Sequence, residues 1–278
     1  MILKFLKKTK RFLINFKHFV HDYKLYYENL NTEMRKIREV LAYQLLIEDA
    51  RDVHGEVFPK YKNCHRNMDV AVIGGGPTLD KWIAPQECIQ IGVNATCQAP
   101  NVHLDYCFWN DYGDEMLSII KHANSPNCKY FFGHTDLYGV QAIPFYIAED
   151  VGAERYFYTN KYNFPYTDNY PYEFPIDISK KPFFMYGTTI HIAMQFALYT
   201  HPKRIYIVGC DCSAGHSSKY PNILDAGKAA VDLPPQSLDV IIQGWQKLAN
   251  FAQQLYPDIE IISVNPVNLK GVFKDIYT

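Results

Sequence analysis

The chain has 278 residues, a formal net charge of −1 and an apolar fraction of 48%. A nearly neutral charge argues against a general nucleic-acid binder, which needs a basic surface for the phosphate backbone. The length suits one large α/β domain with an extension, and the apolar fraction suffices for a sizeable core. The seven cysteines lack metal-ligand spacing, and Cys210 and Cys212 are too close for an ordinary disulfide. These features predict a reducing, cytoplasmic setting.

The first 51 residues predict one long helix, or two, because no Pro or Gly occurs before Gly55. Two mostly apolar rows recur every seven residues, the pattern of a coiled-coil seam and of a homo-oligomer. The rows are Leu6, Leu13, Val20, Tyr27, Met34, Leu41 and Ile2, Thr9, Phe16, Tyr23, Leu30, Ile37.

The first half of this helix is also basic. Lysines and arginines at positions 4, 7, 8, 10, 11 and 17 precede the first acid, Asp22, which is typical of a helix on an anionic membrane surface. Packing of the helix on its own domain or on another subunit remains equally open, so peripheral contact with the inner face of the cell membrane is one of two expectations. No apolar run reaches the ~18 residues of a membrane span, and lysines interrupt any signal-peptide pattern.

From Asp69 onward the pattern alternates between strands and helices. We expect a helical extension over residues 1–55, a polar connector, and a domain over residues 68–278 with a lid at about 211–236. The alternation predicts a Rossmann-like α/β fold, a mostly parallel sheet with helices on both faces. Strands are expected at 69–74, 89–93, 106–109, 129–133, 155–159, 204–209 and 260–264, and helices at 78–83, 114–123, 188–199 and 237–256. The aromatic stretch from Asn160 to Phe184 is long for a plain connection and predicts a wall or lid, or a cover over a core edge.

A glycine turn follows the first strand. After the apolar run from Val70 to Ile73 come Gly74, Gly75 and Gly76, and then Pro77 and Thr78, which open an expected helix. Glycines allow close backbone approach to a ligand, so the turn predicts a nucleotide-phosphate cradle, although a tight strand–helix connection has the same pattern. The turn does not match the dinucleotide-binding fingerprint, because Leu79 stands where that motif has its third glycine and Asn94 where it has an acidic residue at the end of the second strand. The Lys-Ser/Thr pair of a P-loop is also missing. Neither NAD nor Walker-type ATP is therefore expected.

Polar residues follow the other predicted strands, where ligands of open α/β sheets bind. They are mostly neutral, which suits a nucleotide or sugar better than a metal, and no Asp-x-Asp follows a strand as many Mg²⁺-dependent sugar transferases require. No metal or other cofactor is expected. The candidates are Asn94, Asn110, Asp211, Ser213 and Asn265, with Thr188 and Thr189 at the start of a helix.

The loop from Ser213 to Tyr220 carries the reactive side chains. His216 has a pKa range suited to deprotonating an acceptor hydroxyl, whereas Lys219 and Tyr220 can stabilise a leaving phosphate. Asp211 and Asp232 are alternative bases, and an exposed polar loop without a role is the plain alternative.

These motifs, in this order from Asp69 to Val272, resemble the bacterial sialyltransferases related to the Campylobacter lipooligosaccharide enzymes. The wider superfamily includes motility accessory proteins and hydroxymethylpterin pyrophosphokinase-like proteins. The resemblance rests on Gly74–Leu79, Gly92–Asn94, Trp109–Asn110, Tyr186–Thr189, Ile205–Asp211 and Val264–Pro266.

The resemblance implies a metal-independent inverting glycosyltransferase of surface-polysaccharide synthesis. A CMP-activated acidic sugar would be the donor and a glycan or glycolipid the acceptor, with Asn94 and Asn110 on the cytidine nucleotide. One departure matters, because the family places its catalytic histidine just before the last long helix, where residues 232–237 have none. The alternatives are an ATP- and Mg²⁺-dependent diphosphokinase of the pterin type and a non-catalytic nucleotide-binding assembly protein.

Overall fold

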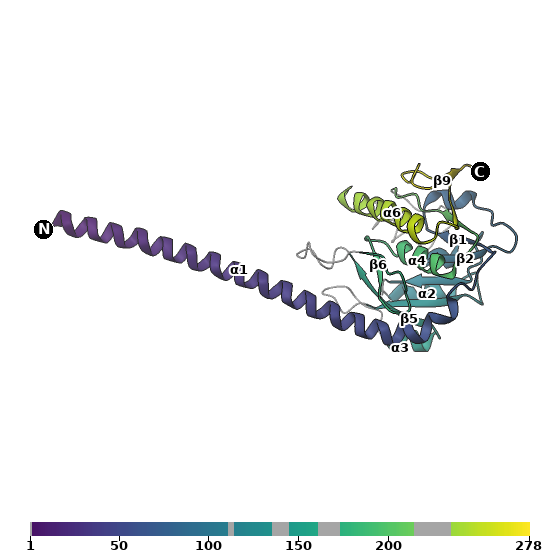
Figure 1. Ribbon diagram of the computed structural model, residues 1–278, viewed down its shortest axis with the longest axis horizontal. Helices are drawn as coiled ribbons and strands as arrows, with labels where there is room; N and C mark the ends of the chain where they lie inside the picture. Colours follow the sequence, from purple (N-terminus) through teal and green to yellow (C-terminus); the bar gives the residue numbers. More distant parts are fainter. Residues whose placement is uncertain (1, 111–113, 135–144, 161–172, 214–234) are drawn as a thin grey trace.

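The computed structural model describes residues 2–110, 114–134, 145–160, 173–213 and 235–278. Helix α1 (Ile2–Val57) is one continuous helix, whose C-terminal end packs on an α/β domain and whose N-terminal part projects far from it (Figure 1). The predicted helical extension is therefore a single helix, and it runs six residues beyond Arg51. Among the described residues, no helix has the combination of length and hydropathy that crossing a membrane requires.

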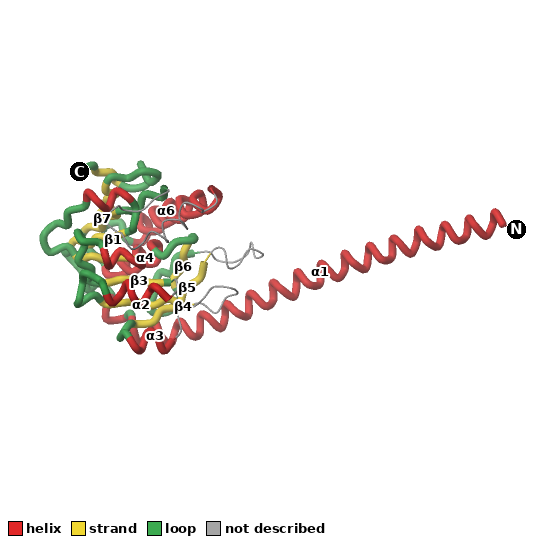
Figure 2. The backbone as a smooth tube through the Cα atoms, turned by 180° about the vertical axis from the view of Figure 1, so that it is seen from behind, coloured by secondary structure: helices red, strands yellow, loops and turns green. Residues whose placement is uncertain are grey.

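The described part of the domain contains one sheet of nine strands, with the order β6-β5-β4-β3-β2-β1-β7-β8-β9 (Figure 2). Each neighbouring pair in this order is parallel, which confirms the predicted fold class. The strands are β1 (Asp69–Ile73), β2 (Ile89–Val93), β3 (Tyr106–Trp109), β4 (Lys129–His134), β5 (Glu154–Asn160), β6 (Phe183–Met185), β7 (Arg204–Val208), β8 (Glu260–Val264) and β9 (Lys274–Ile276).

An interior pairing of the sheet joins β1 to β7, two strands far apart in the sequence. Asp69 lies opposite Arg204 in the register, and the guanidinium donates to both carboxylate oxygens of Asp69, from Nε at 2.8 Å and from Nη2 at 2.7 Å. A bidentate pair of this kind fixes orientation as well as distance. It therefore specifies the register at the N-terminal ends of the two strands.

Alternate residues of the strands enter two cores, one on each face of the sheet. One face, with Val70, Val72 and Phe108, packs against α4 (Ile190–Thr200), α6 (Pro235–Leu255) and the end of α1. The other face, with Ala71, Ile73 and others, packs against α2 (Asp114–Lys121), α3 (Phe145–Asp150) and the short helices η2 (Pro77–Lys81) and η3 (Asn94–Gln98). Every residue of α4 is buried, as expected for a helix enclosed on all sides.

A buried histidine joins the end of α1 to the sheet. His54 is fully buried, and its Nδ1 donates to the carbonyl oxygen of Ile178 at 2.7 Å. Its Nε2 accepts from the backbone N–H of Phe157 in β5 at 2.7 Å. These bonds require the neutral ring, and burial lowers the pKa of His54 to about 4 although its carbonyl partners act in the opposite direction.

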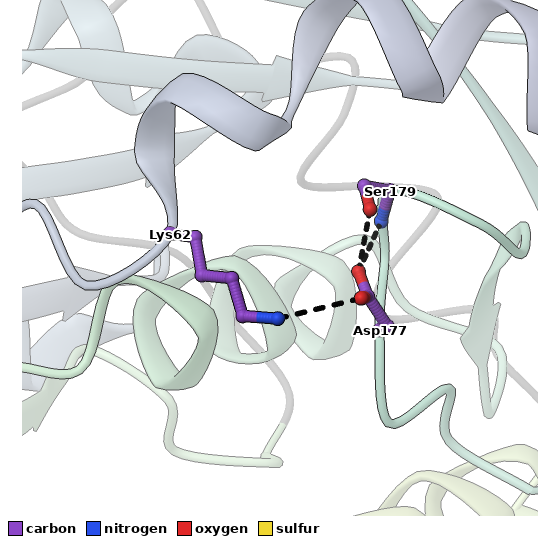
Figure 3. A network of polar contacts seen from close by, with 3 residues as sticks. All are labelled: Lys62, Asp177 and Ser179. Carbon is purple, nitrogen blue, oxygen red and sulfur yellow. Dashed lines mark hydrogen bonds and ion pairs between the residues drawn. The ribbon is translucent and has the colours of Figure 1, made fainter.

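Polar contacts next to α1 hold the connector in place (Figure 3). Lys62, just after the short helix η1 (Pro59–Tyr61), donates to the Asp177 carboxylate at 3.4 Å. The backbone N–H and the hydroxyl of Ser179 donate to the other Asp177 oxygen, at 3.0 and 2.6 Å. Hydrogen bonds from Ser179, together with Lys62, outweigh the effect of burial and lower the pKa of Asp177.

Several predicted boundaries were wrong. The expected polar connector from Gly55 contains the last turn of α1 and η1, and the helix expected at 78–83 is the 3₁₀ helix η2. Strand β6 lies at the end of the aromatic stretch, and β9 was not predicted. Phe174 in that stretch is a buried core residue, whereas residues 161–172 lie outside the described ranges.

Candidate functional site

A pocket lies where the direction of strand addition reverses. Strands β1 to β6 extend the sheet to one side of β1, whereas β7 crosses to its other side. In open α/β sheets the crevice at the carboxyl ends of two such strands is the usual ligand site. Here the residues after β1 and those after β7 face each other across this pocket.

The pocket has a volume of about 180 Å³. Pockets that enclose a whole drug-sized ligand have ~300–1,000 Å³, so this one can hold a single phosphate or ring of a larger ligand. Its lining comes from the ends of β1, β2 and β7, the start of α4 and the inner face of α6. The lining residues are Gly74, Gly75, Gly76, Val93, Thr188, Ile190, Gly209, Cys210, Asp211, Cys212, Ser213, Leu238, Ile241 and Trp245.

The glycine turn differs from the expected cradle of free amides. The Gly74 N–H donates to the Val208 carbonyl at 2.8 Å, and the Gly76 N–H donates to the Gly209 carbonyl at 2.7 Å. A Cβ on Gly76 would lie 2.5 Å from an Asp211 carboxylate oxygen, so the glycines let β1 and β7 approach closely. Within the described chain only the Gly75 N–H of the three has no acceptor.

Asp211 is held by the start of η2. Its carboxylate accepts the Thr78 backbone N–H at 2.9 Å and a short hydrogen bond from the Thr78 hydroxyl. The side chain is only 4% exposed, so both oxygens serve the strand–helix turn. This geometry gives Asp211 and Thr78 structural roles and leaves the Asp211 carboxylate poorly placed to act as a base. Pro77, at the first position of η2, is exposed and does not line the pocket.

The N-terminus of α4 opens onto the pocket through Thr188 and Ile190. The N-cap residue Thr189 makes no side-chain capping bond, and its side chain is buried. Two of the first amides of α4 are already engaged, because the His191 N–H donates to the Thr188 carbonyl at 3.3 Å and the Ile192 N–H to the Thr189 carbonyl at 2.9 Å. The Ile190 N–H has no acceptor among the described residues and can meet an anion, which the helix dipole favours at this end. Thr188 and Thr189 were both predicted as binding residues. Only Thr188 lines the pocket, whereas Thr189 packs in the core.

The three strand-end asparagines do not line this pocket. Asn94 and Asn265 have φ of 48° and 49°, a left-handed conformation that Asn adopts more readily than most residues. Asn265 also binds Thr278, with Nδ2 donating to the hydroxyl and Oδ1 accepting the backbone N–H, both at 2.9 Å. Asn110 is 2% exposed, and its Oδ1 accepts a short hydrogen bond from the Tyr156 hydroxyl. The Asn110 and Asn265 side chains thus bind protein groups in this structure.

Trp245 is a pocket residue that the sequence analysis missed. It is fully buried on α6, and its Nε1–H lies outside hydrogen-bond distance of any acceptor among the described residues, although it is near enough to the Cys212 sulfur to lower the pKa of that thiol. Buried polar groups are rarely left unpaired, so a donor of this kind at a pocket is suited to a ligand oxygen. Its position among Ile241, Leu248 and Ala252 in the apolar stripe of α6 gives only a core signal in the sequence.

The two thiols beside Asp211 remain protonated at neutral pH. Burial raises the pKa of Cys212 to about 12, partly offset by the nearby Trp245 N–H. Burial likewise raises the pKa of Cys210 well above its ordinary value. Because the thiolate is the reactive form, this argues against a cysteine nucleophile. Cys212 also has φ of 48°, an uncommon backbone conformation for this residue type of the sort that clusters at functional sites.

His191 is fully buried behind the pocket and accepts the Tyr186 backbone N–H at 3.1 Å. Burial lowers the pKa of His191 to about 3, so the ring is neutral and serves the core. The predicted catalytic residues His216, Lys219 and Tyr220, the alternative base Asp232 and most of the expected lid lie outside the described residues. Ser213 is the last described residue before them and lines the pocket.

Where the structure describes the chain, no group of three or more His, Cys, Asp or Glu side chains is arranged to hold a metal ion. The chain matches no protein-family model and no curated protein sequence. Among solved structures it is similar to the sialyltransferase CstII of Campylobacter jejuni, determined in complex with the substrate analogue CMP-3FNeuAc. The likeness has a TM-score of 0.43 and 15% identity, and covers 74% of this chain and 85% of that one. A likeness at this level carries no conclusion about function.

Proposed function

We propose that the chain is a glycosyltransferase that uses a nucleotide-activated sugar, with a CMP-activated acidic sugar as donor and a glycan or glycolipid hydroxyl as acceptor. The observation that carries the proposal is the pocket at the switch point between β1 and β7. This is where doubly wound folds bind nucleotides. The ordered motifs shared with the bacterial sialyltransferases give the cytidine nucleotide and the acidic sugar as the expected donor.

The donors around the pocket fit a phosphate attached to a larger polar ligand. The Ile190 N–H at the start of α4 can bind the phosphate, and the Gly75 N–H can bind a further phosphate or ribose oxygen, since neither has an acceptor among the described residues. The Trp245 Nε1–H supplies a directional donor within an apolar wall made by Ile190, Leu238 and Ile241. A few placed donors in a largely apolar pocket are the usual means of orienting a small ligand.

In the proposed reaction an acceptor hydroxyl attacks the anomeric carbon as the bond to the CMP phosphate breaks, with inversion and without a metal. His216 takes the hydroxyl proton as general base. CMP leaves with the bonding electron pair, and Lys219 and Tyr220 stabilise its phosphate. The Asp211 carboxylate, engaged by Thr78, is a weaker candidate for the base than His216.

Differential scanning fluorimetry with CMP, CDP, UDP, ATP and NAD, each with and without Mg²⁺, tests the nucleotide class, because a bound ligand raises the melting temperature. We expect CMP or CDP to do so without Mg²⁺. Binding of ATP only with Mg²⁺ would favour the pterin-type diphosphokinase. Tight CMP binding without transfer to any acceptor would favour the non-catalytic assembly protein.

A matched pair of tryptophan variants tests the pocket. Trp245→Phe keeps a six-membered aromatic ring and removes the pyrrole part of the indole with its Nε1–H. CMP should therefore bind roughly 2- to 10-fold more weakly, the effect of one lost neutral hydrogen bond, and the control below accounts for the lost volume. Trp82→Phe is the control, because Trp82 is also buried with an unpaired Nε1 among the described residues but packs on the opposite face of the sheet. Isothermal titration calorimetry measures both. Equal affinity in the two variants would remove Trp245 from the site.

A further inference from the structure

The N-terminal helix changes its surroundings along its length. Near its C-terminal end, Leu46, Ala50 and His54 follow one another at spacings of four residues and are buried against the domain. Before that segment the helix projects away from the domain (Figures 1 and 2). The side chains described between Tyr26 and Leu45 are mostly exposed, apart from Ala42 and Tyr43, which pack near Leu46. The domain therefore covers one end of the helix and leaves the other part to solvent.

The projecting part carries an apolar seam. Tyr27, Leu30, Met34, Ile37 and Leu41 are spaced alternately by three and four residues, and their exposed fractions run from 42% to 60%. Such alternation repeats every seven residues and places the side chains in one stripe along the helix, at positions a and d of a coiled coil. In the sequence the same two rows continue back to Leu6 and Ile2. An isolated helix of this length gains its stability mainly from packing of such a stripe.

Flanking charges indicate what covers the seam. With Tyr27, Met34 and Leu41 at position a, Glu33 occupies position g and Arg38 the following position e. In a parallel pair of helices in register, position g of one chain lies beside the next position e of the other. Glu33 would therefore meet Arg38 of the partner subunit, an attractive pair, and Val40 would meet Leu45 of the partner subunit in an apolar contact. The Glu33 carboxylate contacts Lys36 of its own helix at 2.9 Å and is 64% exposed, so it is accessible from outside.

We propose that the projecting part of α1 forms a parallel, in-register coiled coil with one or more further copies of this chain, through Tyr27, Leu30, Met34, Ile37 and Leu41. The seam supplies the apolar contact, and the Glu33–Arg38 pairing favours the parallel orientation. The proposal is independent of the reaction in the nucleotide pocket. A membrane surface would not require opposite charges at these two flanking positions.

Sedimentation equilibrium of the full chain tests the association. We expect a dimer or larger closed oligomer at micromolar concentration, and at least a 100-fold weaker association in the variant Met34→Glu/Ile37→Glu. The control variant Asn29→Glu/Thr32→Glu adds the same charge at exposed positions outside the seam and should associate like the native chain. Circular dichroism and urea unfolding of the domain show that each variant is folded.

Cysteine cross-linking tests the orientation. In a Cys64→Ser background, which removes the exposed native thiol, Ile37→Cys should form a disulfide between copies on mild oxidation, and Thr32→Cys should not. A parallel, in-register pair brings together the two copies of every seam residue, so Leu30→Cys should cross-link as well as Ile37→Cys, whereas an antiparallel pair can bring together the copies of only one of these residues. A monomer at 100 µM, association that persists in the Met34→Glu/Ile37→Glu variant, or equal cross-linking at positions 32 and 37 would overturn the proposal. So would a monomer whose seam is needed only for binding to phosphatidylserine vesicles.

Discussion

Two buried histidines, His54 and His191, link the stability of the fold to pH. Both are neutral in the folded chain, and burial lowers their pKa from 6.5 to about 4 and about 3 respectively. In the unfolded chain each takes up a proton near pH 6.5. Between pH 6.5 and these lower values the unfolded state thus binds more protons than the folded state. Their stabilising effect is complete above about pH 6.5 and is lost as the pH falls.

We predict that the native chain loses about 2 kcal/mol more unfolding free energy between pH 7 and pH 5 than the variant His191→Gln, which cannot titrate at this position. Gln retains an acceptor for the Tyr186 N–H. Urea unfolding at the two pH values measures the difference. The exposed His103→Gln is the control and should follow the native chain. An identical pH dependence in the native chain and His191→Gln would contradict the assignment.

The Asp211–Thr78 contact gives a second prediction at the scale of single residues. Asp211→Asn replaces one acceptor oxygen by an amide that cannot accept, so the unfolding free energy should fall by about 1.5–3 kcal/mol, the range for hydrogen bonds to a charged group. The effect should be at least ~1 kcal/mol smaller in a Thr78→Val background, because bonded residues couple in a double-mutant cycle. A large loss of turnover with unchanged stability would instead restore Asp211 as a catalytic base.

Among the elements, the contact between the ends of β1 and β7 shapes the pocket. Gly209 has φ of +61°, and a Cβ there would lie 2.4 Å from the Gly74 carbonyl oxygen. Because the clashing atom belongs to the backbone of the β1 end, it cannot move aside as a flexible side chain could. Gly152, with φ of +66°, has the same left-handed backbone conformation as Gly209. A Cβ built on Gly152 would have no atom within 4 Å, so an added side chain would meet no steric clash there.

The two glycines therefore make a matched pair. Gly152→Ala should cost about 1–2 kcal/mol, the penalty for an L-residue in the left-handed region. Gly209→Ala adds a clash with the backbone and should cost roughly 2–5 kcal/mol in total, and it should weaken nucleotide binding because it separates β1 from β7. Chemical denaturation and calorimetry provide the readouts. An equal loss of unfolding free energy in the two variants would show that the backbones of Gly74 and Gly209 can move apart to accept a Cβ.

The predictability of the elements from sequence follows from how strong their patterns are. Runs rich in β-branched residues, such as Val70–Ile73 and Ile205–Val208, defined their strands to within a residue. Strands of three residues such as β6 and β9 are too short to show an alternation of apolar and polar residues. They form because they pair with a neighbouring strand. Of the predicted site residues, Gly74–Gly76, Thr188, Asp211 and Ser213 line one pocket, and their roles stay predictions. The bonds of Asn110 and Asn265, and the exposure of Trp245 to the pocket, depend on contacts between distant segments that no local pattern encodes.

At the scale of the whole molecule, the domain and the projecting part of α1 are separable. The contacts of the helix with the domain begin at Ala42 and Tyr43, whereas Tyr27, Leu30, Met34, Ile37 and Leu41 are exposed. We predict that deleting residues 1–32 reduces the oligomer size or the binding to anionic liposomes and leaves the CMP affinity unchanged. Light scattering, liposome sedimentation and calorimetry measure these quantities. A truncated chain with unchanged mass and unchanged lipid binding would contradict both roles of the helix, and a weakened CMP affinity would contradict the separation.

The place of β1 between β2 and β7 also sets an order of events during synthesis on the ribosome. β1 pairs with β7, and the paired residues Asp69 and Arg204 are 135 positions apart. At ~5–20 residues per second, roughly 7–27 s elapse between the emergence of the two strands. During that interval the nascent chain can add β2 to β6 on one side, while the other edge of β1, with Val70, Val72 and Ile73, remains an open template for mispairing. Ribosome-associated chaperones should therefore engage nascent chains that end shortly before Arg204 more strongly than chains that extend past β7.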